Sequence, residues 1–293
     1  MEDRQEYDKH KRKEKIKMSL NIDKVFQDAY DAEVKRAYGQ VGMLQNTVYT
    51  KTGVIGKSIY FRKKGKGMAT QHIANANRTA MNVDFNQVQC NLQDWEAFDY
   101  VDKMSMKKIN FTEIKELAEV AGDALGLRKD QIIIDAINAG YDSTNMKFGT
   151  SGNALTVATL ISASTALDNN GVPSDDRYFI HTAKQKSDLL NTTPVTSADY
   201  NSVQTLVSGK INDFLGMKFI CIAKRDEGGL PNDGTNDIGF VYHKRAVGFA
   251  LGQEVQTEMS WVAERGAWLV GGDFSAGAVV IDDDGIAGIM SVD

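Results

Sequence analysis

Two short runs contain residue types that serve as phosphate-binding or nucleophilic groups in other proteins. The run Gly56-Lys57-Ser58 has the glycine, lysine and hydroxyl of a phosphate-binding loop. That motif needs another glycine five residues before the second one, and here Lys51 stands at that position. The run Gly149-Thr150-Ser151-Gly152 lacks the Gly-x-Ser-x-Gly spacing of a nucleophile elbow. We therefore interpret the first run as a hairpin turn and the second as a loop.

A third run, Asp282-Asp283-Asp284-Gly285, offers the carboxylate oxygens that a hard cation prefers. It lacks the spacing of a calcium loop, and an acidic turn between apolar residues 279–281 and Ile286 explains it. The histidines have no recognisable catalytic or metal-binding spacing; they are His10, His72, His181 and His243. We therefore expect no enzyme activity, no cofactor, and no catalytic, cofactor-binding or metal-ligating residues.

A cluster of basic residues is the remaining candidate site. It surrounds the glycines near residue 53 and comprises Lys51, Lys57, Arg62, Lys63, Lys64 and Lys66. Such a run is most often a solvated face, and contact with phosphates is a second interpretation. A third interpretation is contact with an acidic surface on a neighbouring subunit. The residues expected at that inter-subunit contact are Lys57, Arg62, Lys63, Lys64 and Lys66.

Composition argues against several functional classes. The 293 residues are 42% hydrophobic and 25% charged, an ordinary globular composition with room for one large domain or two modest ones. The net charge of -5 argues against a general nucleic-acid binder. No apolar run predicts a transmembrane span, and the charged N-terminus lacks the apolar core of a signal peptide. Two cysteines, Cys90 and Cys221, are too few for a disulfide framework, which indicates a reducing cytoplasm.

The elements that must position the basic cluster begin with an arm. Residues 1–17 are almost all polar and predict a solvated helix or a disordered segment. Residues 19–37 predict a modest amphipathic helix. The β-prone runs Thr47–Tyr49 and Ser58–Arg62 then predict the two sides of a long β-hairpin around Gly53. A second arm is expected to return through the alternating residues 87–93.

A long helix and a mixed segment follow. Asn110 and Glu113 resemble a capping box, and apolar residues then recur on one helical face until Gly140. Further helices are predicted at residues 157–169, 183–190 and 199–209. Strands are predicted at residues 178–181, 217–223, 238–243, 254–262, 267–270 and 277–281. The mixture favours an α+β fold.

Four segments, in this order, resemble those of one protein family. The first segment is Leu167–Arg177 together with the Tyr-Phe-Ile-His that follows it. It is similar to a pattern in which the end of a helix is followed by Val-Pro, by Arg and by an apolar strand. Leu206–Ile222 is similar to a Gly-x-Ile, Gly-Phe-x-Ile run, and Tyr242–Gly248 resembles Phe-His-Lys-x-Ala-Val-Gly. The glycine-rich stretch 271–288 is like the end of a peripheral domain. Residues 20–293 thus resemble the major capsid protein of tailed bacteriophages, with the Hong Kong 97-type fold.

The resemblance implies a division of the chain into four parts. Residues 1–44 would be an N-terminal arm, and residues 45–85 an extended loop (E-loop) that reaches over an adjacent subunit. Residues 86–149 and 241–293 would form the peripheral domain, with a long spine helix and a long sheet. Residues 150–240 would form the axial domain, which meets its copies at the centre of a capsomer.

The function that the resemblance implies is structural. Copies of the chain would assemble as hexamers and pentamers into the icosahedral head shell that encloses a double-stranded DNA genome. Expected partners are the chain itself, a portal, scaffolding or cement proteins where a shell needs them, and DNA through weak non-specific contact, but no membrane. The location would be the virion capsid, after assembly in the host cytoplasm. The alternatives are an encapsulin-like compartment shell and a small α/β enzyme with an unrecognised site.

Overall fold

The computed structural model describes residues 42–65, 67–72, 80–102, 112–191 and 213–292, together with residues 31, 32, 34, 74, 77 and 78. The polar segment 1–17, most of the helix predicted at 19–37, the capping residue Asn110 and the helix predicted at 199–209 lie outside these residues. The described residues form two compact units. One contains the described parts of 1–42, 94–127 and 254–275, and the other those of 43–93, 128–253 and 276–293.

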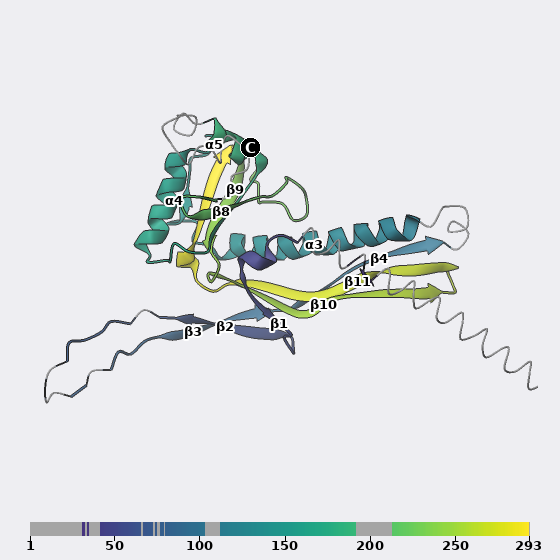
Figure 1. Cartoon of the computed structure of the whole chain (residues 1–293), viewed down its shortest axis with the longest axis horizontal. Helices are drawn as coiled ribbons and strands as arrows, with labels where there is room; N and C mark the ends of the chain where they lie inside the picture. The colour runs from purple at the N-terminus through teal and green to yellow at the C-terminus, as the bar shows by residue number, and fades with distance from the viewer. Residues whose placement is uncertain are drawn as a thin grey trace, which may run out of the picture. The chain divides into compact units, whose positions relative to one another are not determined.

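A six-stranded sheet forms much of the second unit, in the order β5-β12-β9-β6-β8-β7. Its strands are β5 (Lys147–Phe148), β6 (Arg177–His181), β7 (Asp213–Phe214), β8 (Met217–Cys221), β9 (Asn236–His243) and β12 (Ile286–Val292). Every residue of β6 and β9 is buried, so the centre of the sheet is covered on both faces. Helices α4 (Val157–Asn169) and α5 (Ala183–Leu190) lie beside this sheet (Figure 1). Leu160 and Leu167 of α4 join Phe179 in its core.

Both helices begin where their sequences predict. The Thr156 hydroxyl accepts a hydrogen bond from the Thr159 backbone N–H at 3.3 Å and caps α4. Thr182 and Gln185 form a complete capping box at the start of α5. The Gln185 side chain also donates to the Asp237 carbonyl, which links α5 to β9. The predicted bounds of α4 and α5 are confirmed.

Arg177 ties the end of α4 to the start of β6. Its guanidinium is 2% exposed and donates to the carbonyl oxygens of Val172 (2.6 Å) and Pro173 (2.8 Å). It also lies 2.6 Å from the Asp168 carboxylate. Because a buried charge is costly unless its hydrogen bonds are made, this residue fixes the turn around Val172-Pro173.

A four-stranded sheet has the order β1-β10-β11-β4. Its strands are β1 (Tyr49–Thr52), β4 (Gln93–Asp102), β10 (Val247–Val262) and β11 (Ala267–Val280). The predicted long helix is confirmed as α3 (Thr112–Gly140), a single helix of 29 residues. Two glycines mark its close approach to β11: a Cβ on Gly272 would lie 3.2 Å from Leu125, and one on Gly140 would lie 2.6 Å from Val280. No helix among the described residues is long and apolar enough to cross a membrane.

Buried polar side chains of α3 hold the chain where it enters β1. The Asp130 carboxylate accepts the backbone N–H groups of Met43 (3.1 Å) and Leu44 (3.0 Å). Lys129 donates to the side chain of Gln45 at 2.6 Å. Burial lowers the pKa of Lys129 to about 8 despite the opposing charge of Asp130. These bonds satisfy the backbone N–H groups just before the short helix Gln45–Thr47 and so fix where the chain enters β1.

The hairpin prediction is wrong in its pairing. β1 does not pair with β2 (Ser58–Lys64); it pairs in parallel with β10, Tyr49 opposite Gly248. β2 instead pairs with β3 (Phe85–Asn91), which confirms the arm predicted to return through residues 87–93. Together, β2 and β3 form a two-stranded ribbon, called the ribbon below. The physical reason is that hydrogen bonds from β10, nearly 200 residues away, satisfy β1 and continue to Val54, whose N–H donates to Leu251. Local β propensity carries no information about such a distant partner.

The C-terminal strands also differ from their predicted bounds. The strand predicted at 254–262 begins at Val247, and the strands predicted at 267–270 and 277–281 are one strand, β11. β12 was not predicted at all. Three glycines of the glycine-rich stretch, Gly271, Gly272 and Gly277, lie inside β11, where they admit neighbouring backbone. A Cβ on Gly277 would clash with the Asn91 carbonyl oxygen. Glycine at this position therefore allows the two backbones to pack closely.

Replacing Arg177 tests the clamp between α4 and β6. Arg177→Met keeps an unbranched aliphatic chain but leaves the Val172 and Pro173 carbonyls without a donor. We expect the free energy of unfolding of the unassembled subunit, measured in urea, to fall by about 2–3 kcal/mol. Asp168→Asn is the control, because the Asp168 side chain is 60% exposed, and a loss below about 1 kcal/mol is expected. Equal losses would contradict the assignment.

Replacing Gly277 tests the packing of β11 against the end of β3. Gly277→Ala places a methyl group against backbone that cannot rotate away, and about 1–3 kcal/mol of stability should be lost in the same urea titration. Ala278→Val is the matched control on the next residue. Ala278 borders a cavity of about 470 Å³, so the added methyl groups have space, and a change within about 0.5 kcal/mol is expected. A stable Gly277→Ala variant would contradict the close approach.

Candidate inter-subunit contact site

Phe61 attaches the ribbon to the four-stranded sheet. It is 1% exposed and clusters with Cys90, Ala250 and Ile281. A Cβ on Gly248 would lie 2.9 Å from the Phe61 ring, so this glycine leaves the space that the ring fills. Tyr49 of β1 packs edge-on against the same ring, with centroids 6.0 Å apart.

Lys63 attaches the same strand to the acidic turn between β11 and β12. Its Nζ lies 2.9 Å from Oδ1 of both Asp282 and Asp283. Partial burial alone would lower the pKa of Lys63, but the two carboxylates outweigh this effect and raise it. The same hydrogen bond holds the pKa of Asp283 below its usual value. The acidic turn, which the sequence predicted, is therefore a partner of the basic cluster within one chain.

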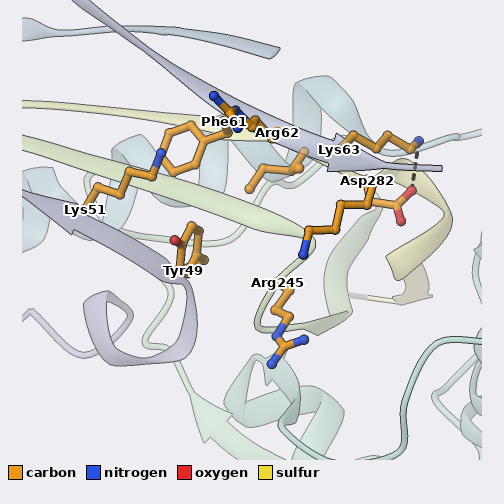
Figure 2. A pocket seen from close by; sticks show the side chains of 9 residues that line it. Tyr49, Lys51, Phe61, Arg62, Lys63, Arg245 and Asp282 are labelled. Carbon is orange, nitrogen blue, oxygen red and sulfur yellow. Dashed lines mark ion pairs between the residues drawn. The ribbon is translucent and has the colours of Figure 1, made fainter. Parts of the chain in front are cut away.

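A cavity of about 610 Å³ opens beside this attachment (Figure 2). Its lining residues come from β1, β2 and the turns before β10 and after β11; they are Tyr49, Lys51, Phe61, Arg62, Lys63, Lys64, Arg245, Ile281 and Asp282. Lys51 Nζ lies 4.6 Å from the centre of the Phe61 ring and donates to the Tyr60 carbonyl at 3.1 Å. With five cationic side chains and one carboxylate, the cavity favours an anionic group.

The two faces of the ribbon differ because side chains alternate along a strand. Phe61 and Lys63 face the rest of the unit, as their contacts show. The opposite face, called the outer face below, is exposed and holds three cross-strand pairs: Tyr60–Gln89, Arg62–Gln87 and Lys64–Phe85. It contains two cations, two aromatic rings and two amides, and no acidic residue. This composition suits contact with a partner that is acidic and partly apolar.

The structure brings together three of the five predicted contact residues. Arg62, Lys63 and Lys64 line the cavity, whereas Lys57 is exposed before β2 and does not line it. Lys66 lies outside the described residues. The cavity also contains residues that the sequence did not indicate as contacts, notably Tyr49 and Arg245. Arg245 is distant in sequence from the basic cluster, and no local pattern identifies it.

The negative net charge of the whole chain does not reveal that the segment containing the basic cluster is strongly basic. Between Glu33 and Asp84 the sequence contains no acidic residue and nine basic ones. The whole chain nevertheless has a net charge of -5, so the remainder is strongly acidic. Such separation of charge favours attraction between different parts of neighbouring copies. Among the residues that the structure describes, no group of three or more His, Cys, Asp or Glu side chains forms a metal site.

Comparison of the sequence with models of protein families finds a match to one family. The model of a family described as phage capsid protein matches residues 22–292, which is most of the chain. No curated protein sequence matches significantly.

Solved capsid structures share the fold at low sequence identity. The head of Helicobacter pylori bacteriophage KHP40 gives a TM-score of 0.69 at 14% identity, covering 83% of this chain and 88% of the other. The capsid of cyanophage P-SCSP1u gives 0.66 at 16% identity, covering 85% and 88%. A virus-like particle from Pyrococcus furiosus gives 0.60 at 14% identity, covering 90% and 99%.

The predicted α+β fold of the Hong Kong 97 type is therefore confirmed, with the long helix α3, the long strands β10 and β11, and the ribbon as its described parts. The exposed basic ribbon belongs to a protein whose task is to bind other subunits, not to catalyse a reaction. The chain belongs to the phage capsid protein family, and it is a major capsid protein, the structural subunit of an icosahedral head shell.

Proposed function

We propose that residues 45–85, which include β2 and the loop at the tip of the ribbon, form the E-loop through which each subunit reaches over its neighbour in the shell, and that β3 leads back from it into the peripheral domain. The proposed contact residues are Lys57, Arg62, Lys63, Lys64 and Lys66. Lys63 acts by holding the ribbon to Asp282 and Asp283 of its own chain, and the exposed cations act on the neighbour.

The observation that carries this proposal is the exposure of large apolar side chains along this segment. Ile55 is 98% exposed and Met68 84%, and Tyr60, Met81 and Phe85 are also more than half exposed. A two-stranded ribbon buries too little apolar surface to be stable alone. Exposed apolar side chains of this number on a segment of about 30 residues mark a surface that another protein covers.

The remaining parts take the roles that their positions suggest. Residues 1–44 form the N-terminal arm, residues 86–149 and 241–293 the peripheral domain, and residues 150–240 the axial domain at the capsomer centre. By these bounds α4, α5, β6, β7 and β8 lie in the axial part, and α3, β10 and β11 lie in the peripheral part. The strands β5 and β12, although they belong to the six-stranded sheet, also fall within the peripheral bounds, and β9 crosses the boundary.

The shell is proposed to enclose double-stranded DNA, to contain a portal, and to assemble in the host cytoplasm with scaffolding or cement proteins where required. The acidic balance of the chain supports weak, non-specific contact with DNA, since a wall of like charge does not hold a packaged genome tightly. A second candidate is a compartment shell with protein cargo, which the likeness to the Pyrococcus furiosus virus-like particle favours.

Purification of the chain followed by light scattering and negative-stain microscopy tests the shell. We expect capsomers that convert into closed megadalton particles, because identical subunits with matched interfaces assemble by symmetry. Nuclease-protected DNA in particles from infected cells would support a phage head, and protein cargo would support the compartment. A mass that stays at 32.3 kDa, that of one chain, under all conditions of salt and crowding would contradict both.

Reversing the charge of Lys63 tests how the ribbon is held within the subunit. Lys63→Glu places a third carboxylate beside Asp282 and Asp283, so the ribbon should detach locally. We expect limited proteolysis of the unassembled subunit between residues 57 and 92 to become about fivefold faster, with little change in global stability, because an exposed ion pair contributes about 0.2–1 kcal/mol.

Two variants control this experiment. Asp282→Lys combined with Lys63→Glu restores the opposite charges and should return the cleavage rate toward that of the unmodified chain. Lys64→Glu should leave the rate unchanged, because Lys64 has no carboxylate partner among the described residues. Equal acceleration by Lys63→Glu and Lys64→Glu would show that the ion pair does not hold the ribbon.

A further inference from the structure

We propose that the outer face of the ribbon binds the exposed acidic face of strand β4 in a neighbouring copy, with Arg62 and Lys64 opposite Asp94 and Glu96. This inference rests on the proposed function and names the partner surface that the E-loop contacts.

The cations of the outer face are available for a partner. Arg62 and Lys64 border the cavity but are still exposed on the ribbon, and within the described part of the chain neither has an ion-pair partner. Lys63, between them, is already paired with Asp282 and Asp283. The adjoining aromatic side chains Tyr60 and Phe85 are 52% and 69% exposed, so apolar area accompanies the charge. Cations beside exposed aromatic rings are typical of protein interfaces.

β4 provides the complementary surface. It is an edge strand of the four-stranded sheet, and its ten residues include Asp94, Glu96, Asp99 and Asp102 but no Lys or Arg. Alternation places Asp94 and Glu96 on the same exposed face as Tyr100, which is 43% exposed. Neither carboxylate has an ion-pair or hydrogen-bond partner among the described residues. This face, called the acidic face of β4 below, thus combines the unpaired negative charge of Asp94 and Glu96 with the partly exposed Tyr100 ring, over which the Arg265 guanidinium lies at 4.3 Å from the ring centre.

The spacing of the charges agrees on the two surfaces. Arg62 and Lys64 are two residues apart on one strand, as are Asp94 and Glu96 on the other. Side chains two residues apart on a strand are separated by about 6.8 Å, so both charge pairs can be matched at once. Directly opposed unlike charges attract each other, and a slide by two residues along the strand would leave only one of the two pairs matched. The contact would therefore also set the register between subunits.

A second copy explains these features better than a nucleic acid does. A phosphate backbone would be attracted to the cations of the outer face but would be repelled by the acidic face of β4 and would leave it without a partner. Every chain in a shell of identical chains contributes one basic ribbon and one acidic strand. If each ribbon binds the β4 strand of a neighbour, every ribbon and every β4 strand has a partner. The partner is thus an acidic strand face, supplied by another copy of this chain.

A charge exchange between the two surfaces tests the inference. Arg62→Glu/Lys64→Glu and Asp94→Lys/Glu96→Lys should each reduce the yield of closed particles by at least about tenfold, because like charges would then face each other in every interface. The fourfold variant that carries both changes should recover most of the yield. Circular dichroism and mass measurement of each unassembled subunit establish that it is folded.

The matched control is Asp99→Lys, which reverses a charge on the same strand but on its opposite face. It should not restore assembly of the Arg62→Glu/Lys64→Glu variant. Normal assembly of that variant into DNA-free particles would overturn the inference and assign the cations to the genome. Loss of assembly without recovery in the fourfold variant would also overturn it, since the ribbon would then have another partner. Neither result would affect the shell function, which particles of the unmodified chain test by themselves.

Chemical cross-linking of the unmodified chain provides a second test that does not depend on folding of a variant. A carbodiimide joins a lysine amine to a carboxylate only when the two are in contact. In particles assembled from mixed light and heavy isotope-labelled subunits, we expect peptides in which Lys64 is joined to Asp94 or Glu96, including light–heavy pairs. Closed particles that contain Lys64 joined only to other carboxylates, or not joined at all, would overturn the inference.

Discussion

The position of the ribbon depends on the burial of one aromatic side chain, Phe61. Two isolated strands are marginally stable at best, so a ribbon that extends into solvent needs an attachment at its base. Burying a phenylalanine contributes about 1.5–3 kcal/mol, which is comparable to the cost of ordering one or two residues. The space for its ring exists only because residue 248 is glycine. Lys63 then adds a directional contact to Asp282 and Asp283, and side-chain alternation turns Arg62 and Lys64 outward.

This attachment separates the two functions of the basic cluster. The residues that face inward hold the ribbon to its own subunit, and those that face outward remain available for another. A shell benefits from this division, because a ribbon of fixed direction loses less conformational freedom when it binds its neighbour. Each inter-subunit contact can then be modest, since symmetry repeats it throughout the particle.

The rest of the second unit is held by buried polar groups that are satisfied within the chain. Arg177 closes the turn between α4 and β6, Gln185 joins α5 to β9, and Asp130 receives the backbone that leads into β1. Each bond links segments that lie apart in sequence or in different elements. Such groups would destabilise the protein if unpaired, so they favour one arrangement of the elements over close alternatives.

The sequence by itself determined the α+β class, the bounds of α4 and α5, and the single long helix α3. These features depend on local signals: a capping residue, apolar recurrence and a terminal glycine. The order of four short segments was sufficient to indicate the capsid family. The basic cluster was also visible, because charged residues adjacent in sequence stay adjacent in an extended strand.

Only the tertiary structure decided which strands pair and which way each cation faces. β1 joins β10 rather than β2, and Arg245 lines the same cavity as Lys51 and Lys64, although the residues brought together are nearly 200 positions apart in sequence. Gly271 and Gly277 lie where another backbone passes close by. The pairing of strands and the direction in which a side chain points depend on the free energy of the complete folded structure. A short stretch of sequence does not contain that information.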